Sequence, residues 1–382
     1  MDFQLTEEQK LIRDTVRDFA QQEIAPRAQE MDEQGEFPWE IIHAMAGLGF
    51  LGLPVPEKYG GAGADTVSFV LLMEEIARAS GSVALTIDAH TGLCCEPLLL
   101  FGTEEQKQRY LVPLARGEKI GGLAVTEPGG GSDIAGGVKT AARRDGGEWV
   151  ISGGKAFITN GSVADVVIVL ARTDPAKGKR GFSHLMVEKG TPGFRAGKDE
   201  KKMGLRASVT TPLFFEECRV PADRLLGVEG EGLKQSLIIL DNGRVAIAAM
   251  AVGLAQAAFE AAVRYARERT AFGGPLADLQ AIQWKLADMA TEIEAARLMV
   301  YHAAWLKDQG RPFKKEAAMA KLFASEMAER ACFEAIQIHG GYGYIKEYGV
   351  ERMYRDQRLC TIGEGTSEIQ RWVIAREVLG RF

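Results

Sequence analysis

One glutamate near the C-terminus has a setting suited to acid–base chemistry. Glu364 lies between Gly363 and Gly365, and the next two residues, Thr366 and Ser367, can cap the start of a helix. Glycines on both sides allow the backbone to turn tightly, so that a carboxylate can project from it. Such a carboxylate can serve as a general base. An acidic residue at a helix start is also favoured by the helix dipole alone, and for an isolated glutamate this plainer interpretation is the stronger one.

Two glycine-rich segments are candidates for ligand binding. Residues Leu123–Asp133 (LAVTEPGGGSD) predict a strand that leads into a loop of glycines and small hydroxyls, where bare N–H groups can approach a flat or anionic ligand. Taken alone, this loop is more simply a turn between strands. Residues Gln337–Gly343 (QIHGGYG) interrupt a helical pattern and precede a charged run, which is as typical of a helix C-cap as of a binding site.

Several common chemistries lack their motifs. The sequence contains no G-x-G-x-x-G after a strand, no P-loop, no H-E-x-x-H and no G-x-S-x-G. The five histidines are far apart in the sequence, so no local metal cluster is expected, and only a site built from distant residues stays open. Nicotinamide-binding Rossmann, nucleotide-phosphate, zinc-protease and hydrolase functions are therefore disfavoured.

Length and composition set further limits. A chain of 382 residues with 46% hydrophobic and 26% charged residues is too long for one small module and too apolar for a disordered protein. The net charge of −6 provides no basic field for nucleic acid or for an anionic membrane.

Cysteine usage and the N-terminus predict a cytoplasmic location. The five cysteines include a single vicinal pair and form no disulfide framework, which is typical of a reducing compartment. The N-terminus carries acids and a helical pattern rather than a secretory signal. The longest apolar stretch, Val245–Phe259, is shorter than the ~20 residues of a membrane span and predicts a buried helix.

The elements that must position these residues fall into three regions. Capping-box patterns at Thr6/Gln9 and Thr103/Gln106 open helical stretches in the first third. Short apolar runs separated by turn signals follow and predict strands. Long helical patterns then return, over 233–269, 276–309 and 313–338, with shorter ones at 350–358 and 367–379. We therefore predict an α+β multidomain fold: an N-terminal helical domain (1–120), a middle β-barrel-like domain (121–231) and a C-terminal four-helix bundle (232–382).

Taken together, the motifs resemble those of the acyl-CoA dehydrogenase family, from Phe3 to about Leu379. Residues 123–133 look like the family's flavin loop, and 337–343, with Glu347, Arg352 and Asp356, look like its C-terminal motif. The segments 240–244 (LDNGR), 267–273 (RERTAFG) and 363–371 (GEGTSEIQR) are most similar to the short-chain, butyryl-type branch.

The resemblance implies a homotetramer, a dimer of dimers, with one FAD per subunit between the middle and C-terminal domains. Arg269 and Gln280, with residues 337–341 of a neighbouring subunit, are similar to those that hold the pyrophosphate and adenosine, and residues 366–368 close the site. The cofactor-binding residues implied in this way are Leu123, Ala124, Val125, Thr126, Ser132, Phe157, Ile158, Thr159, Arg269, Phe272, Gln280, Gln337, Ile338, His339, Gly340, Gly341, Thr366, Ser367 and Glu368.

The implied reaction is dehydrogenation of a short- to medium-chain acyl-CoA to the trans-2-enoyl-CoA. Glu364 would remove the α-proton, and the β-hydride would pass to flavin N5. The implied substrate-binding residues are Ser132, Asp241, Asn242, Gly243, Arg244 and Gly365.

Two positions bear on the branch of the family. An isovaleryl-type subfamily has its catalytic base at the position that corresponds to Gly243. Because glycine cannot be a base, Gly243 supports the assignment of Glu364 as the base in this chain. The butyryl-type branch usually has tyrosine where this chain has Gly363, so strict butyryl specificity is in doubt and a larger acyl pocket is an open alternative.

Two rival functions are considered. An acyl-CoA oxidase would pass electrons to O2, but the oxidases are typically longer and this chain stops at Phe382, so we expect electron-transferring flavoprotein as the acceptor. A flavin-containing DNA-binding relative would add a basic C-terminal region, whereas residues 351–382 contain six basic and five acidic residues. We expect no nucleic acid partner and no membrane insertion.

Overall fold

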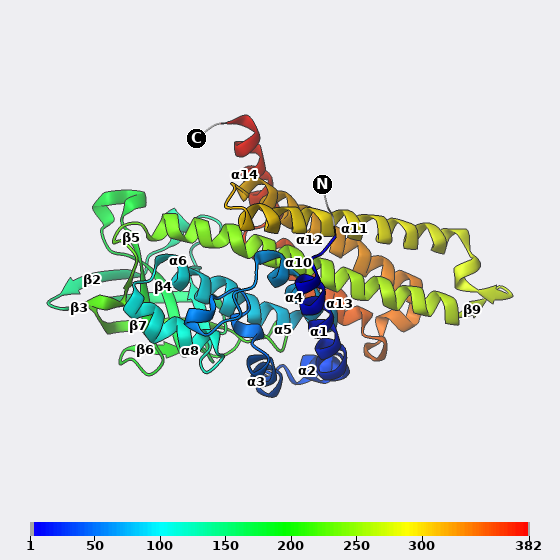
Figure 1. Cartoon of the computed structure of the whole chain (residues 1–382), viewed down its shortest axis with the longest axis horizontal. Helices are drawn as coiled ribbons and strands as arrows, with labels where there is room; N and C mark the ends of the chain where they lie inside the picture. The colour runs from blue at the N-terminus through cyan, green and yellow to red at the C-terminus, as the bar shows by residue number, and fades with distance from the viewer. Residues whose placement is uncertain (1–3, 381–382) are drawn as a thin grey trace.

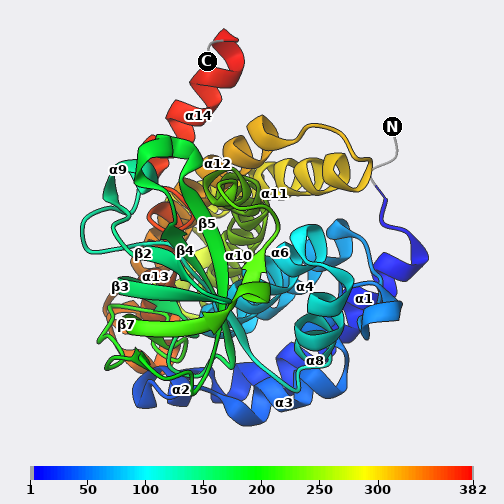
Figure 2. The ribbon, with the colours of Figure 1, turned by 90° about the vertical axis from the view of Figure 1, so that its left-hand side faces the viewer.

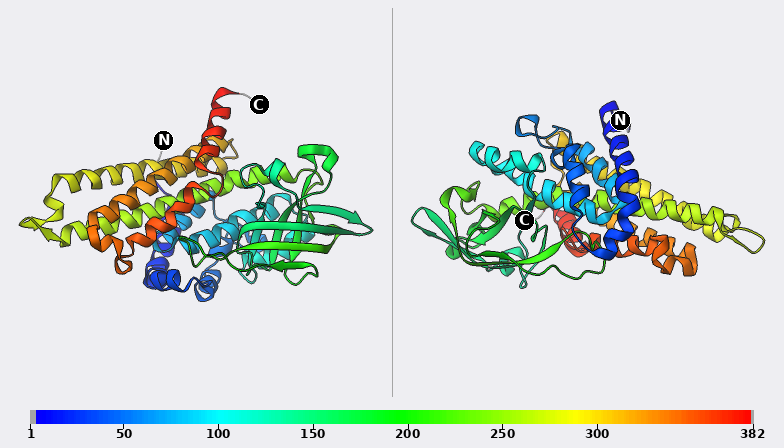
Figure 3. Two further views of the ribbon diagram at one scale, coloured as in Figure 1. Left: turned by 180° about the vertical axis from the view of Figure 1, so that it is seen from behind. Right: turned by 90° about the horizontal axis from the view of Figure 1, so that it is seen from below.

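The computed structural model of the chain describes residues 4–380, and Phe3, where the resemblance begins, lies outside them. Helices, a sheet and more helices follow one another in chain order, as predicted (Figure 1). The molecule is elongated, with the sheet at one end of the long axis and the tips of the longest helices at the other (Figures 1 and 3).

The N-terminal region is helical throughout. Both predicted capping boxes are confirmed: the amide of Gln9 donates to the Thr6 hydroxyl at 3.2 Å, and the amide of Gln106 donates to the Thr103 hydroxyl at 3.2 Å. The elements are α1 (Glu7–Phe19), η1 (Ala20–Ile24), η2 (Ala25–Arg27), α2 (Ala28–Gln34), α3 (Trp39–Gly47), η3 (Phe50–Gly52), η4 (Glu57–Tyr59), α4 (Thr66–Ala79), α5 (Gly81–Ile87), η5 (Asp88–Cys95), α6 (Glu96–Phe101), α7 (Glu104–Gln106), η6 (Lys107–Leu111) and α8 (Val112–Ala115).

The middle region forms one mixed sheet, which faces the viewer in Figure 2. Its order is β6-β7-β3-β2-β4-β5-β8, and β1 pairs in parallel with β4. The predicted apolar runs, 149–151, 166–170, 185–187 and 213–215, lie within β3, β4, β5 and β7. The strands are β1 (Gly121–Ala124), β2 (Ala141–Asp145), β3 (Glu148–Thr159), β4 (Val166–Arg172), β5 (Phe182–Glu188), β6 (Phe194–Ala196), β7 (Thr210–Pro221) and β8 (Leu225–Leu226), with short helices α9 (Ile134–Gly137), η7 (Pro175–Arg180) and η8 (Ala222–Arg224) between them.

The C-terminal region contains the longest helices. A small hairpin of β9 and β10 joins α10 to α11 at the far end of the molecule (Figure 1). Helix α11 begins at Gln280, later than the predicted 276, because Leu279 is extended and follows a separate 3-10 turn. The elements are α10 (Gly232–Glu268), β9 (Thr270–Ala271), β10 (Gly274–Pro275), η9 (Leu276–Asp278), α11 (Gln280–Asp308), α12 (Lys314–His339), η10 (Gly340–Tyr344), η11 (Lys346–Tyr348), α13 (Val350–Gln357), η12 (Arg358–Thr361) and α14 (Ser367–Leu379).

Helix α10 is the centre of the core, and α4 crosses it closely at Gly253. A Cβ atom at Gly253 would lie 2.2 Å from the carbonyl oxygen of Glu74, so only glycine allows this crossing. Two helical stretches, Gly81–Phe101 and Gly232–Glu268, are long and apolar enough to span a membrane by composition, and their apolar windows are 78% and 83% buried inside the fold. Such burial is typical of core helices, which is the role predicted for 245–259.

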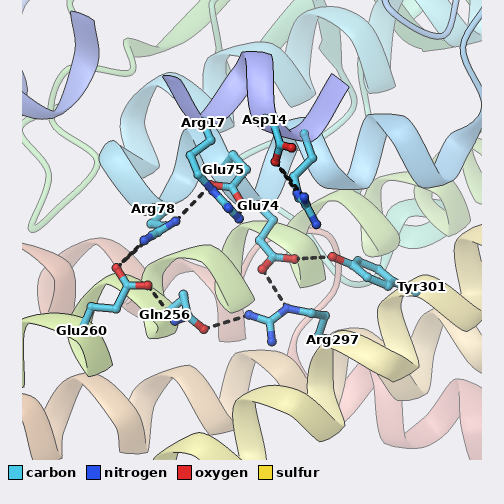
Figure 4. Close-up of polar contacts among 10 residues, drawn as sticks. Asp14, Arg17, Glu74, Glu75, Arg78, Gln256, Glu260, Arg297 and Tyr301 are labelled. Atoms are coloured by element: carbon cyan, nitrogen blue, oxygen red, sulfur yellow. Dashed lines mark hydrogen bonds and ion pairs between the residues drawn. The ribbon is translucent and has the colours of Figure 1, made fainter. Parts of the chain in front are cut away.

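A polar network joins the N-terminal helices to the bundle (Figure 4). Glu74 of α4 accepts from Arg297 Nε at 2.9 Å and from the Tyr301 hydroxyl at 3.0 Å, both on α11. Arg78 of α4 donates to Glu260 of α10 at 2.6 Å. Charged groups from three helices thus satisfy one another at a buried domain contact.

Candidate active site

The backbone of Glu364 is strained and held in place. Its φ of +54° lies in the left-handed region, which costs a non-glycine residue about 1–2 kcal/mol. Gln370 Nε2 donates to the carbonyls of Glu364 and Gly365 at 3.0 and 2.8 Å, and Lys321 Nζ donates to the Gly365 carbonyl at 2.6 Å. Strain maintained by surrounding bonds is a common feature of functional sites, and here it fixes the direction of the carboxylate.

The Glu364 side chain lies directly over α10 at Gly243. A Cβ atom at that glycine would lie 2.6 Å from Glu364 Oε2 and 3.2 Å from Cδ2 of Leu93. Oε2 is buried and has no hydrogen-bond partner among the described residues. Burial raises the pKa of Glu364 to about 7, although the cations of Arg244 and Lys321 act in the opposite direction. A carboxyl group that titrates near neutrality is suited to general-base work.

Lys321 is a site residue that sequence reasoning missed. It lies on α12 with its side chain fully buried, and burial lowers its pKa to about 8. A signal for it exists in the sequence, because Lys321 shares a helical face with the apolar Ala317, Ala324 and Ala328. A lone cation on an apolar face needs a partner, and here the partner is the loop that carries Glu364.

The residues predicted to bind substrate surround Gly243 on α10. Arg244 is buried and forms an ion pair with Asp241, whose pKa is raised mainly by burial. Arg244 Nε and Asn242 Oδ1 are buried and have no hydrogen-bond partner among residues 4–380. Unpaired buried polar atoms of this kind are costly unless a ligand satisfies them.

The next group of predicted residues lies at the C-terminal ends of β1 and β3. Ala156 N donates to the Thr126 carbonyl at 2.9 Å, which fixes the β1 end beside β3. Phe157 has a φ of +58° and is 66% exposed, although it stands between two buried residues of β3. An exposed aromatic ring on a strained backbone offers a stacking surface for a flat ligand.

A buried ion pair that the sequence did not reveal supports this loop. Lys155 Nζ contacts Glu127 Oε1 at 2.8 Å, and Glu127 also accepts from the amides of Lys139 and Thr140. Burial lowers the pKa of Lys155 to about 8, and Glu127 opposes that shift. The pair holds both ends of the glycine loop, which runs from Thr126 to Val138, to β3.

A second group of predicted residues lines a groove near the β9–β10 hairpin, at the end of the long axis opposite the sheet. Arg269, His339, Gly340 and Gly341 line it, and the Arg269 guanidinium lies 5.6 Å from the Tyr342 ring centroid. A Cβ atom at either glycine would meet nothing within 4 Å, so the backbone there is open. The β9–β10 tip carries Phe272, which is 94% exposed with a φ of +55°.

The structure therefore places the predicted residues in three groups: around Glu364, at the hairpin end and at the sheet. Glu364, Gly243 and Arg244 come together, and Thr366, Ser367 and Glu368 follow Glu364 in the first turn of α14 or at its cap. The residues 269–272 and 337–341 lie at the hairpin end, away from the sheet (Figures 1 and 3). At the sheet, Ile158 and Ala124 are buried in strands, Val125 is buried directly after β1, Leu123 is half-buried, Thr159 is paired with Thr210, and Ser132 is exposed in the glycine loop. Gly365 lies beside Glu364, and Gln280 is exposed at the start of α11.

Comparison with known proteins identifies the family. Models of the acyl-CoA dehydrogenase N-terminal, middle and C-terminal domains match residues 6–118, 122–218 and 230–379. The chain is 56% identical to a probable acyl-CoA dehydrogenase, YngJ, of Bacillus subtilis, over 99% of this chain and 100% of that protein.

Solved structures agree over nearly the whole chain. Butyryl-CoA dehydrogenase from Megasphaera elsdenii superimposes with a TM-score of 0.97 at 44% identity, covering 99% of this chain and 100% of the other. A chain solved in work on the electron transferring flavoprotein of Acidaminococcus fermentans gives 0.98 at 45% identity, with the same coverage of both chains.

All three domain models match this helix–sheet–helix chain, and a buried glutamate lies opposite a glycine of its central helix. The chain therefore belongs to the acyl-CoA dehydrogenase family, whose members are flavoprotein oxidoreductases of fatty acid oxidation.

Proposed function

We propose that the protein dehydrogenates a short- to medium-chain acyl-CoA to the trans-2-enoyl-CoA, with Glu364 as the base that removes the α-proton. The observation that carries this proposal is the position of the Glu364 carboxylate over Gly243, buried, unpartnered at Oε2 among the described residues and with a pKa of about 7. The alternative position for the base, residue 243 on α10, carries no carboxylate in this chain, because it is glycine.

The residues present fit an FAD whose isoalloxazine ring lies near Thr126 and Phe157 of one subunit. Its diphosphate would lie near Arg269 of a neighbouring subunit. The exposed Phe157 ring supports the first part, and the open groove at Gly340 and Gly341 beside an exposed arginine supports the second. When bound, the flavin supplies a hydride acceptor for the substrate β-carbon.

The protein groups then have distinct tasks. Glu364 must be ionised to take the proton, and its strained backbone keeps the carboxylate aimed at one point. We propose that its backbone N–H donates to the thioester oxygen, and that Asp241–Arg244, Ser132 and Gly365 contact the thioester and the pantetheine arm. Each donor to the developing oxyanion is worth about 3–4 kcal/mol in other enzymes.

We also propose a homotetramer, a dimer of dimers, in which residues 337–341 of one subunit, with the Arg269 that lines the same groove, serve the FAD of another. The separation of the two residue groups along the molecule supports this, because both would be needed for one dinucleotide. Exposed aromatic side chains on the bundle, such as Trp284 at 64% exposure, are also typical of an oligomer interface.

For the electron acceptor we propose electron-transferring flavoprotein, the protein for which one of the similar solved structures is named. For the location we propose the cytoplasm, which is supported by the five free, buried cysteines. The domain limits 1–120, 121–231 and 232–382 remain our proposal for the boundaries.

The test is the Glu364→Gln variant, mixed anaerobically with butyryl-CoA. We expect the variant to retain bound FAD and to lose nearly all bleaching of the flavin band, because glutamine cannot accept the proton. Glu377→Gln is the matched control, since Glu377 of α14 is paired with Lys314 at the surface. Bleaching at the wild-type rate in Glu364→Gln would show that another group is the base.

A further inference from the structure

Asp88 is a buried carboxyl group that nothing in the described chain satisfies. It is the first residue of the π-helix η5, its exposure is 0%, and neither of its carboxyl oxygens has a hydrogen-bond partner among residues 4–380. Buried polar groups in proteins are nearly always hydrogen-bonded, so a carboxyl group without a partner requires an explanation.

The geometry of η5 places Asp88 on the side of the helix that faces Gly243 and the Glu364 carboxylate. Hydrogen bonds in a π-helix join residues five apart, so Asp88 and Leu93 lie on the same side. Leu93 reaches the space over Gly243 that the Glu364 carboxylate also occupies. The Asp88 carboxyl group lies against Gly92, where a Cβ atom would lie 2.6 Å from Asp88 Oδ1, so glycine at position 92 makes room for it.

The surroundings of Asp88 favour its neutral form. The two charged groups that act on it, Glu364 and Glu96, are both carboxylates, and with burial they raise its pKa well above the usual value. Burial and the two neighbouring carboxylates thus both act in favour of the protonated form of Asp88. A neutral carboxyl group offers one O–H donor and one carbonyl acceptor.

We propose that Asp88 recognises an uncharged hydroxyl group on the acyl chain of the substrate, beyond the β-carbon. This inference rests on the proposed function and specifies its substrate class. A hydroxyl group both donates and accepts, so it satisfies both oxygens of a neutral carboxyl group, whereas an alkyl chain leaves them unpaired. An ammonium group is disfavoured, because a cation near both carboxylates would lower the pKa of Glu364 and weaken the base.

Space for a substituted chain is available next to Glu364, at Gly363. A Cβ atom at Gly363 would meet its nearest neighbour, Leu359, at 3.6 Å, an ordinary contact. The glycine thus leaves unfilled the volume that a larger side chain would occupy next to the base.

The experiment compares acyl-CoA pairs of equal size on the FAD-loaded enzyme. Freshly prepared 4-hydroxybutanoyl-CoA is set against pentanoyl-CoA, and 5-hydroxypentanoyl-CoA against hexanoyl-CoA, with kcat/KM measured by dye reduction. We expect the wild type to prefer the hydroxylated member of at least one pair by about tenfold, the size of one buried hydrogen bond. In Asp88→Val this preference should reverse through KM, and Asp88→Asn should retain part of it.

Thr86→Val is the matched control, because Thr86 is a buried polar residue of the preceding helix whose hydroxyl lies 3.4 Å from the Ser208 hydroxyl. It should leave the preference unchanged. Flavin content and thermal midpoint establish that each variant is folded. Equal kcat/KM within both pairs in the wild type, or a preference for 4-aminobutanoyl-CoA, would overturn the inference while leaving the proposed function intact. Failure of every acyl-CoA to reduce the flavin would overturn the proposed function itself.

Discussion

Adding a single methyl group at Gly243 should disable the enzyme without unfolding it. In Gly243→Ala the new Cβ atom would lie 2.6 Å from Glu364 Oε2, whereas ordinary contacts begin at 3.4 Å, so the carboxylate must move by about 0.8 Å. A displacement near 1 Å costs about 100-fold in rate when geometry is decisive. Alanine is also the better helix former by about 1 kcal/mol, so α10 should be as stable as before.

The assay is single-turnover flavin reduction by saturating butyryl-CoA, with flavin content and thermal midpoint measured in parallel. Gly47→Ala is the control, because a Cβ atom at Gly47 meets nothing within 4 Å. We expect the control to reduce its flavin normally and Gly243→Ala to be slower by about 100-fold, with both proteins fully loaded. A normal rate in Gly243→Ala would refute the placement of the Glu364 carboxylate over this glycine.

Three further outcomes are expected. Flavin reduction should rise with pH through about 7 and then level off, because Glu364 is inactive while protonated below its raised pKa; a profile that stays level across this range would contradict its role. Arg297→Met should lower the free energy of unfolding by about 2–3 kcal/mol, since it leaves the Glu74 carboxylate buried without its cation, and a second change, Glu74→Gln, should recover part of the loss in urea titrations. Arg269→Ala should release FAD on dialysis with little change in acyl preference, and an unchanged flavin content would count against a diphosphate contact.

Local sequence signals predicted the elements well. The Thr6 and Thr103 caps bond as expected, since a capping box needs only residues three apart. The period of apolar residues located α10 and α12 to within a residue or two. The observed start of α11, Gln280, is later than the predicted one because Leu279 has an extended backbone, which no local sequence pattern indicates.

The site was predictable only where its chemistry shows in the chain itself. Two glycines around Glu364 signal a tight turn, and the structure has φ of +54° there. Lys155 and Asp88 gave no such signal, and Lys321 was detectable only as a lone cation on an apolar helix face. The partners of Lys155 and Lys321 come from distant segments, and Asp88 has none among the described residues. Long-range pairing of this kind depends on tertiary packing and is not encoded by local periodicity.

The groove at the hairpin end has a consequence for mixtures of variants. Because Arg269 lies at the end opposite the sheet, an assembly that joins this groove to another subunit's sheet builds each centre from two polypeptides. Refolding an Arg269→Ala preparation together with a Glu364→Gln preparation would then create hybrid particles. In some active sites of these hybrids, one subunit would supply the intact arginine and the other the intact glutamate. Mixing two inactive variants would then restore turnover.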